Sequence, residues 1–116
     1  MELIIDELIL YLENTKDETW CTDVVKTNDG KSCVMGHVFD FGGNKMWELF
    51  EAMIATTFMI YPVNDGEHPN YQQPTAKERC IAYLKAVKEG KEKTSYQLWE
   101  EAGNEIIAEK IDKAHR

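Results

Sequence analysis

The stretch NKMWELFEAMIATTFMIY, residues 44–61, is the longest mainly apolar stretch of the chain, although two threonines interrupt it, and it decides the fold class. Glu48 and Glu51 are its only clearly polar interior residues, so apolar positions surround the helical axis. A helix with this pattern is buried on all sides, which predicts the central core helix of an α-rich protein. Asn44 is expected to cap this helix, and Pro62 is expected to stop it because proline breaks the helical hydrogen-bond ladder.

A shorter helix is predicted immediately before it, in SCVMGHVFDFGG at residues 32–43. Ser32 is a favourable cap for a helix beginning at Cys33, and the pair Gly42-Gly43 is a favourable end. Gly36 is expected where helix and backbone approach closely. The opening segment, residues 2–13, is a further amphipathic helix with a wide apolar face.

Residues 20–32 interrupt the helical pattern. The run from Trp20 to Lys26 is rich in aromatic and β-branched residues, and Asn28-Asp29-Gly30 is a turn signal. We expect a short strand or extended arm here, with at most a two-stranded element.

Two more helices are predicted in the second half. Thr75 and Glu78 form a capping box that opens a helix to about Lys88, which Gly90 closes. Thr94 with Gln97 opens the last helix, at about residues 95–114. The chain therefore predicts a mainly α single domain over residues 1–116. It has four to five helices, a core in residues 2–88 and a short extended excursion near residues 20–32.

Composition and charge exclude several classes of protein. The 116 residues carry a net charge of −8, which disfavours direct binding to nucleic acid or to an anionic membrane. The apolar runs are too short for a membrane helix, and the acidic opening segment does not resemble a secretory signal. Three cysteines without a CxxC pair favour reduced thiols and a cytoplasmic location.

The negative charge lies almost entirely in the first half. Residues 1–67 hold 13 Asp/Glu against 4 Lys, a net of −9, and residues 68–116 hold 8 Asp/Glu against 9 Lys/Arg, a net of +1. Such a split can mark an interaction surface, and plain solvation of helix faces is the simpler explanation. The candidate binding residues are Asp6, Glu7, Glu13, Asp17, Glu18, Asp23 and Asp29.

Two chemical sites are weaker hypotheses. Cys21, Cys33, His37 and Cys80 are the right residue types for a zinc site, with His68 in reserve, but their spacing matches no known finger and we predict no metal and no cofactor. Cys33 at a helix start would have a lowered thiol pKa, and His68 with Asp65 or Asn64 would complete a cysteine-hydrolase arrangement. Buried structural cysteines and an exposed loop histidine are the simpler alternative, so we do not predict an enzyme.

Several of these short motifs resemble a family of uncharacterised small domains of actinobacteria and their phages. The likeness covers about residues 2–88, and Val34 and His37 depart from the small residues typical of the family. It implies helix-packing roles for Cys33 and Gly36 and a bacterial or phage origin. The motifs are Trp20-Cys21, the Asp29-Gly30 turn, Cys33 to Gly36, Asn64-Asp65 and the helix from Thr75 to Val87.

These observations predict a small acidic interaction protein. We expect a phage-encoded inhibitor of a host defence or nucleic-acid-handling complex, acting in the host cytoplasm through its acidic first half on a partner with a basic surface. One alternative is a homo-oligomeric adaptor or ligand-sequestering protein, a homodimer built on the last helix with its apolar stripe from Trp99 to Ala114. The second alternative is the cysteine hydrolase.

Overall fold

The computed structural model describes the backbone of residues 2–114 and the side chains of residues 4–105. Within that part of the chain five α-helices and one short 3-10 helix make up the fold, which confirms the mainly α class. The elements are α1 (Glu2–Glu13), η1 (Asp17–Thr19), α2 (Val34–Met53), α3 (Thr57–Asn64), α4 (Ala76–Lys88) and α5 (Ser95–Ala114).

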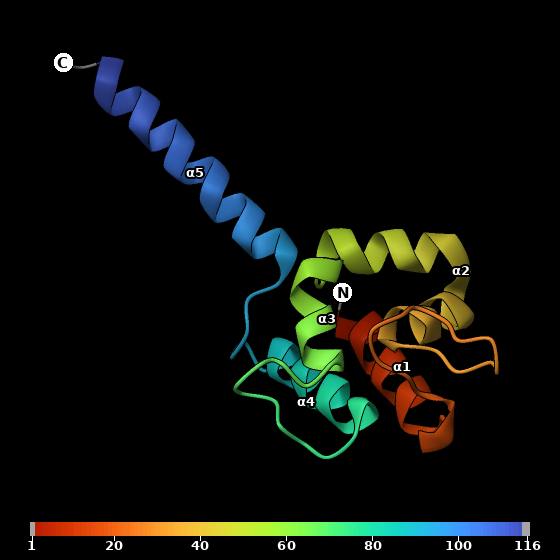
Figure 1. Ribbon diagram of the computed structural model, residues 1–116. Coiled ribbons are helices and arrows are strands. Elements are labelled where there is room, and N and C mark those ends of the chain that lie inside the picture. The colour runs from red at the N-terminus through yellow and green to blue at the C-terminus, as the bar shows by residue number, and fades with distance from the viewer. Residues whose placement is uncertain (1, 115–116) are drawn as a thin grey trace.

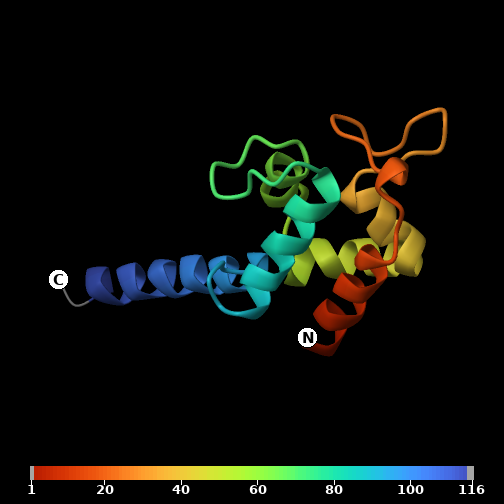
Figure 2. The same ribbon diagram turned by 90° about the horizontal axis from the view of Figure 1, so that it is seen from below.

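The core lies between α1, α2, α3 and α4, and both halves of α2 contribute buried residues to it. Helix α1 runs beside α4, and α3 packs on the other side of α4 (Figure 1). The apolar face predicted for α1 is confirmed, because Ile5, Leu8, Ile9 and Leu12 are all buried. In the view of Figure 2 α4 passes in front of part of α2, and α4 contacts α1, α2 and α3.

The glycine pair Gly42-Gly43 kinks α2 and does not end it. Gly43 has φ +70°, a left-handed conformation that glycine adopts without strain, and the helix then resumes to Met53. The predicted end of the helix at this pair is therefore a bend. Gly36 does lie at a close approach, because a Cβ there would come within 2.8 Å of the Val25 carbonyl oxygen.

The predicted single helix over residues 45–61 is wrong. Helix α2 ends at Met53, and Thr56 adopts an extended conformation as the cap of α3. Pro62 lies inside α3 and does not end it. Because proline has no amide hydrogen, the carbonyl of Phe58 in the first turn lacks its helical partner. The Phe58 side chain is 92% exposed, so water reaches that end of the helix. The prediction that this stretch is buried on all sides is therefore also wrong.

The excursion at residues 20–32 is an extended loop. Two isolated bridges join Trp20 and Lys26 to Ser32, and the described residues contain no strand. The turn is confirmed, since Gly30 has φ +88° and the Thr27 hydroxyl accepts a hydrogen bond from the Lys31 amide at 3.0 Å. Ser32 is buried in these contacts, and Cys33 takes the capping position of α2 in its place.

The caps predicted for the last two helices are confirmed. The Thr75 hydroxyl accepts the amide hydrogen of Glu78, and Gly90 ends α4 with φ +78°. At α5, Thr94 and Gln97 exchange both bonds of a capping box, at 3.0 and 2.8 Å.

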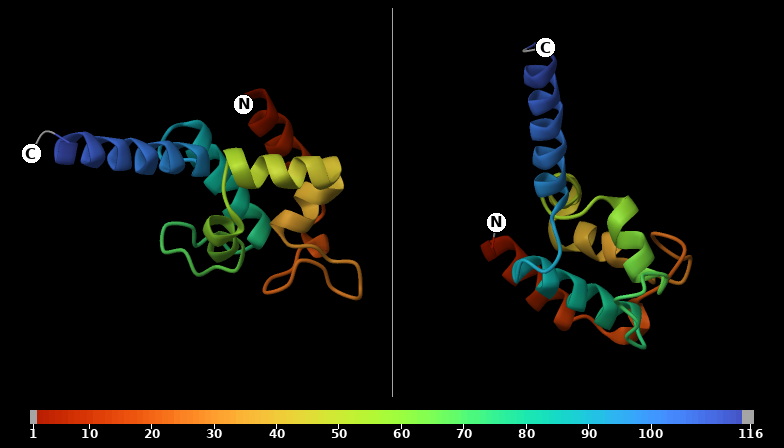
Figure 3. Two further views of the ribbon diagram at one scale, coloured as in Figure 1. Left: turned by 90° about the horizontal axis from the view of Figure 1, so that it is seen from above. Right: turned by 90° about the vertical axis from the view of Figure 1, so that its left-hand side faces the viewer.

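Helix α5 projects away from the other helices (Figures 1 and 3). The principal extents are 61 × 29 × 27 Å, and the long axis exceeds the other two by about 30 Å, the length of a 20-residue helix. The radius of gyration is 16.4 Å, whereas about 13 Å is typical of a compact chain of this length. Residues 2–88 therefore form the packed body and α5 an arm.

Candidate functional site

Asn64, at the end of α3, is a fully buried polar side chain that joins three segments. Its Oδ1 accepts the amide hydrogen of Val34 at 3.0 Å, and its Nδ2 donates to the Cys21 carbonyl and to Asp65 Oδ1, both at 3.0 Å. The side chain therefore caps α2 from a distance of 30 residues in sequence, in the place predicted for Ser32. We call Asn64 with these partners the Asn64 junction.

Arg79 of α4 binds to the backbone next to the Asn64 junction. Its guanidinium donates to the carbonyl oxygens of Val63, Gln73 and Asn64 at 3.1, 2.9 and 2.7 Å. Arg79, in the first turn of α4, thus holds the C-terminal end of α3 and the loop after it, where helix carbonyls otherwise lack partners.

Cys33 is buried at the start of α2 and its environment opposes activation. Burial raises the pKa of its thiol, and the hydrogen bonds from the Gly36 and Met35 amides only offset part of that effect. The lowered pKa expected from the helix dipole is therefore wrong, because desolvation exceeds it.

The three members of the hydrolase hypothesis do not share one cavity. Asp65 and Cys33 line a common cavity of about 280 Å³, but His68 is not among its lining residues. In the following loop His68 Nδ1 accepts the Asn70 amide at 3.1 Å, and its ring contacts Tyr71. The structure thus brings two of the three groups together.

The residues of the zinc hypothesis contact protein groups and do not converge on a common site. Cys80 is fully buried with its sulfur 3.7 Å from Asn64 Oδ1, and the Cys21 thiol contacts the Val24 carbonyl at 3.3 Å. Within the described residues no three His, Cys, Asp or Glu side chains form a metal-binding group.

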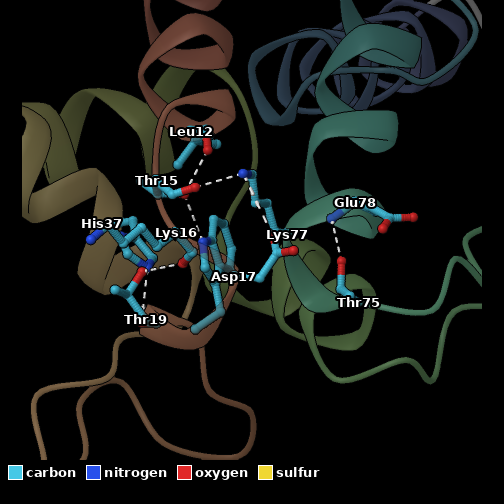
Figure 4. A network of polar contacts seen from close by, with 10 residues as sticks. Leu12, Thr15, Lys16, Asp17, Thr19, His37, Thr75, Lys77 and Glu78 are labelled. Carbon is cyan, nitrogen blue, oxygen red and sulfur yellow. Dashed lines mark hydrogen bonds and ion pairs between the residues drawn. The ribbon is translucent and has the colours of Figure 1, made fainter.

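His37 lies one helical turn after Cys33 on α2, in the network drawn in Figure 4. Its Nε2 is 3.2 Å from the Thr19 carbonyl, so this nitrogen carries the proton, and its ring stacks on Trp20 at 4.4 Å. Trp20 in turn donates to the Thr15 hydroxyl at 2.8 Å. Burial lowers the pKa of His37, which keeps the imidazole neutral and makes it a packing residue.

The acidic binding candidates on α1 and η1 face lysines of this same chain. Asp6, Glu13 and Asp17 form ion pairs with Lys88, Lys85 and Lys77 of α4, the last two at 3.3 and 3.6 Å. Lysines of the second half of the chain therefore neutralise part of the negative charge of the first half. The other candidates, Glu7, Glu18, Asp23 and Asp29, are exposed.

A groove on another face combines apolar side chains with carboxylates. The 280 Å³ cavity adjoins a second hollow of about 570 Å³, and Val25 lines both. Val24, Val25 and Phe39 are 51%, 38% and 43% exposed. We call this surface the acidic groove; it is lined by Asp23, Val24, Val25, Cys33, Tyr61 and Asp65 on one side and by Lys26, Gly36, Phe39, Asn44, Trp47, Glu48 and Glu51 on the other.

The negative charge of the acidic groove is not neutralised within the described part of the chain. Its cation Lys26 pairs at 3.6 Å with Asp40 outside the groove, and no lysine or arginine among residues 4–105 forms an ion pair with Asp23, Asp65, Glu48 or Glu51. Burial raises the pKa of Tyr61, and Glu51 and Asp65 raise it further, so carboxylates from both hollows act on one phenol.

Sequence reasoning named only Asp23 and the low-ranking candidates Cys33 and Asp65 in this groove. A signal for the rest existed in Val24-Val25, two apolar residues inside a loop without helical or alternating periodicity. Phe39, Trp47 and Tyr61 carried no such signal, because their positions on the helices were also compatible with the core.

Comparison of the chain with known protein families, with curated proteins and with solved structures finds no match. None of the helices described here combines the length and apolar character needed to cross a bilayer.

Proposed function

We propose that this protein is a small acidic interaction protein whose acidic groove binds a basic, amphipathic segment of a partner protein. One observation carries the proposal: exposed apolar side chains lie between four carboxylates that have no cationic partner among residues 4–105. Apolar contacts supply affinity, and the carboxylates select a basic partner and speed its approach.

The acidic residues of α1 and η1 are less suitable for binding a basic partner than those of the acidic groove. Its acids were the first candidates, but three of them are already paired with α4 lysines, so a partner would have to displace those lysines. The carboxylates of the groove require no such exchange. A basic segment therefore gains more at the groove than at α1.

The partner class remains the one expected from the charge pattern. A host protein that handles nucleic acid has a basic surface for phosphates, and an acidic protein that occupies this surface inhibits it. We propose this inhibitory role for a phage-encoded chain acting in the host cytoplasm. The cysteine-hydrolase alternative gains no support, because the Cys33 cavity lacks His68 and the pKa of the thiol is raised.

The test is a titration with a synthetic amphipathic Lys/Leu helix as the probe, followed by tryptophan fluorescence. The double variant Glu48→Lys/Glu51→Lys is expected to weaken binding at least about tenfold, since it removes two attractive charges and adds two repulsive ones. The control Glu7→Lys/Glu18→Lys makes the same charge change on exposed candidates outside the groove.

Binding by the control within about twofold of the wild-type value supports the groove. Equal losses in both variants would show that net charge alone attracts the peptide, and an unchanged affinity of the groove variant would overturn the proposal. The same pair of variants then serves in affinity purification from host lysate, where partners must be lost with the groove variant alone.

A further inference from the structure

The loop over residues 21–33 has a cysteine at each end, and the backbone brings these two ends together. The Ser32 amide donates to the Thr19 carbonyl at 2.8 Å, and the Cys21 amide donates to the Ser32 carbonyl at 3.0 Å. These are the two bonds of the parallel bridge between Trp20 and Ser32. Cys21 and Cys33 each follow one member of that bridge directly, so they are the next pair in its register.

This register places both cysteine side chains on the same side of the bridge. Side chains alternate along extended backbone, and Cys33 is extended, with φ −76° and ψ −179°. Trp20 stacks on His37. A Cβ placed at Gly36 would lie 2.7 Å from the Ser32 Cβ, so both bridge residues face the first turns of α2. The two cysteines face the other way, towards the 280 Å³ cavity of the acidic groove that Cys33 lines.

The spacing of the two cysteines fits a disulfide. Neighbouring strands lie about 4.8 Å apart, so this register sets the Cα atoms of Cys21 and Cys33 about 5 Å from each other. Disulfides join Cα atoms that are about 4.4–6.8 Å apart. The two thiols also share their surroundings. Burial raises the pKa of both, the Asp65 carboxylate raises both further, and the Cys33 thiolate raises that of Cys21.

We propose that Cys21 and Cys33 are a redox modification site, which a low-molecular-weight disulfide such as oxidised glutathione converts to a protein disulfide. The Cys21 thiol is only partly buried, so it is the one that the oxidant reaches. Its thiolate attacks one sulfur of oxidised glutathione, which gives a mixed disulfide and one glutathione. The Cys33 thiolate then attacks the Cys21 sulfur and releases the second glutathione. The protein gives up two protons and two electrons, and oxidised glutathione takes them up.

Cys80 is the competing partner for Cys33. Burial raises the pKa of its thiol, and the Cys33 thiolate raises it further, so the two sulfurs are near each other. Cys33 and Cys80 are only 2% and 0% exposed, however, so neither can meet the oxidant first. The Cys80 sulfur also lies 3.7 Å from Asn64 Oδ1, a contact that a Cys33–Cys80 disulfide would remove. Cys21 is therefore the favoured partner.

The disulfide would close the loop that carries Asp23, Val24 and Val25 of the acidic groove. Its formation does not depend on what the groove binds. Closing a loop of this length removes conformational freedom from the unfolded chain, so the oxidised protein is expected to be the more stable form. By the same linkage, the bond is expected to form more readily in the folded chain than in the unfolded chain.

Peptide mapping of the full chain tests the pairing. The reduced protein is equilibrated in glutathione buffers at about pH 8, because the raised pKa of both thiols slows the reaction at neutral pH. It is then blocked with N-ethylmaleimide in urea and digested with trypsin. Trypsin leaves the three cysteines in separate peptides, residues 17–26, 32–45 and 80–85. We expect mass spectrometry to find the first two peptides joined and the third carrying maleimide.

Three variants separate the steps of the reaction. Cys33→Ala is expected to stop at the mixed disulfide of Cys21 with glutathione, and Cys21→Ala is expected to stay reduced. Cys80→Ala is the matched control and is expected to form the disulfide as readily as the wild-type chain. A Cys33–Cys80 product would overturn the proposal, and so would a wild-type chain in which glutathione stays on Cys21.

The folded state must favour the bond. At one glutathione ratio, the disulfide-to-thiol ratio of Cys80→Ala is expected to be at least about tenfold higher in the folded chain than in urea. The melting temperature of the oxidised protein is expected to exceed that of the reduced protein by about 5 °C or more, and Cys21→Ala is expected to lose this difference. An equal or lower ratio in the folded chain would show that the fold strains the pair, which contradicts the register.

Discussion

Asn64 and Trp99 have opposite surroundings, although both lie near a helix end. The Asn64 side chain is fully buried, and its polar atoms bond to Val34, Cys21 and Asp65 of the same chain. The Trp99 ring is 76% exposed on a helix that leaves the body. The first region joins three segments of the fold, while the second leaves an apolar ring exposed within the described part of the chain. Substitutions should therefore lower the unfolding free energy far more at Asn64 than at Trp99.

The largest effect is expected at Asn64. Asn64→Ala leaves the Val34 amide and the Cys21 carbonyl without their partner in a buried site, which costs about 3–4 kcal/mol of unfolding free energy. Urea unfolding measures this value. The matched control is Asn44→Ala. Asn44 is exposed inside α2 and its side chain makes no hydrogen bond among the described residues, so the cap predicted there is absent and a change below about 0.5 kcal/mol is expected. Equal values for the two variants would contradict the structural role of Asn64.

Arg79 comes second. Arg79→Met keeps the apolar stem but removes three charge-assisted bonds to carbonyl oxygens, with an expected loss of about 2–3 kcal/mol in the same urea experiment. Arg79→Lys restores the charge without the planar fork and should recover only part of the loss. Full recovery by lysine would show that charge, and not the three-carbonyl geometry, stabilises the junction.

The pH dependence of stability gives a smaller effect. Burial lowers the pKa of His37, so below the ordinary value of about 6.5 the unfolded chain takes up a proton before the folded chain does. The unfolding free energy is therefore expected to fall as the pH decreases from 7 to 5, by no more than about 1.4 kcal/mol per pH unit for one proton. His37→Gln, which can still donate to the Thr19 carbonyl, should flatten this slope. An unchanged slope would assign the proton to another group.

The smallest effect on folding is expected at Trp99. Because the ring is mostly exposed, Trp99→Ala should change the unfolding free energy of the monomer by about 0.5 kcal/mol or less, measured at low protein concentration. The buried Trp20→Ala is the comparison, with an expected loss of about 3 kcal/mol. A large loss at Trp99 would mean that α5 belongs to the folding core.

Local signals in the sequence were sufficient for the parts of the fold held by neighbouring residues. The caps at Thr75 and Thr94, the turn at Gly30 and the buried face of α1 all depend on residues within a few positions of one another. The acidic candidates were read correctly as surface residues. Their pairing with α4 lysines was not predictable, because it joins residues 60 or more positions apart.

The sequence by itself determined the mainly α class, the ends of α4, the start of α5 and the charge split between the two halves. Only the tertiary structure decided that Asn64 and not Ser32 caps α2, that desolvation raises the pKa of Cys33, and that His37 packs on Trp20. It also decided which apolar residues remain exposed. Helical periodicity shows where apolar side chains point around one helix, but burial depends on whether another segment covers that face, and distant segments supply this cover.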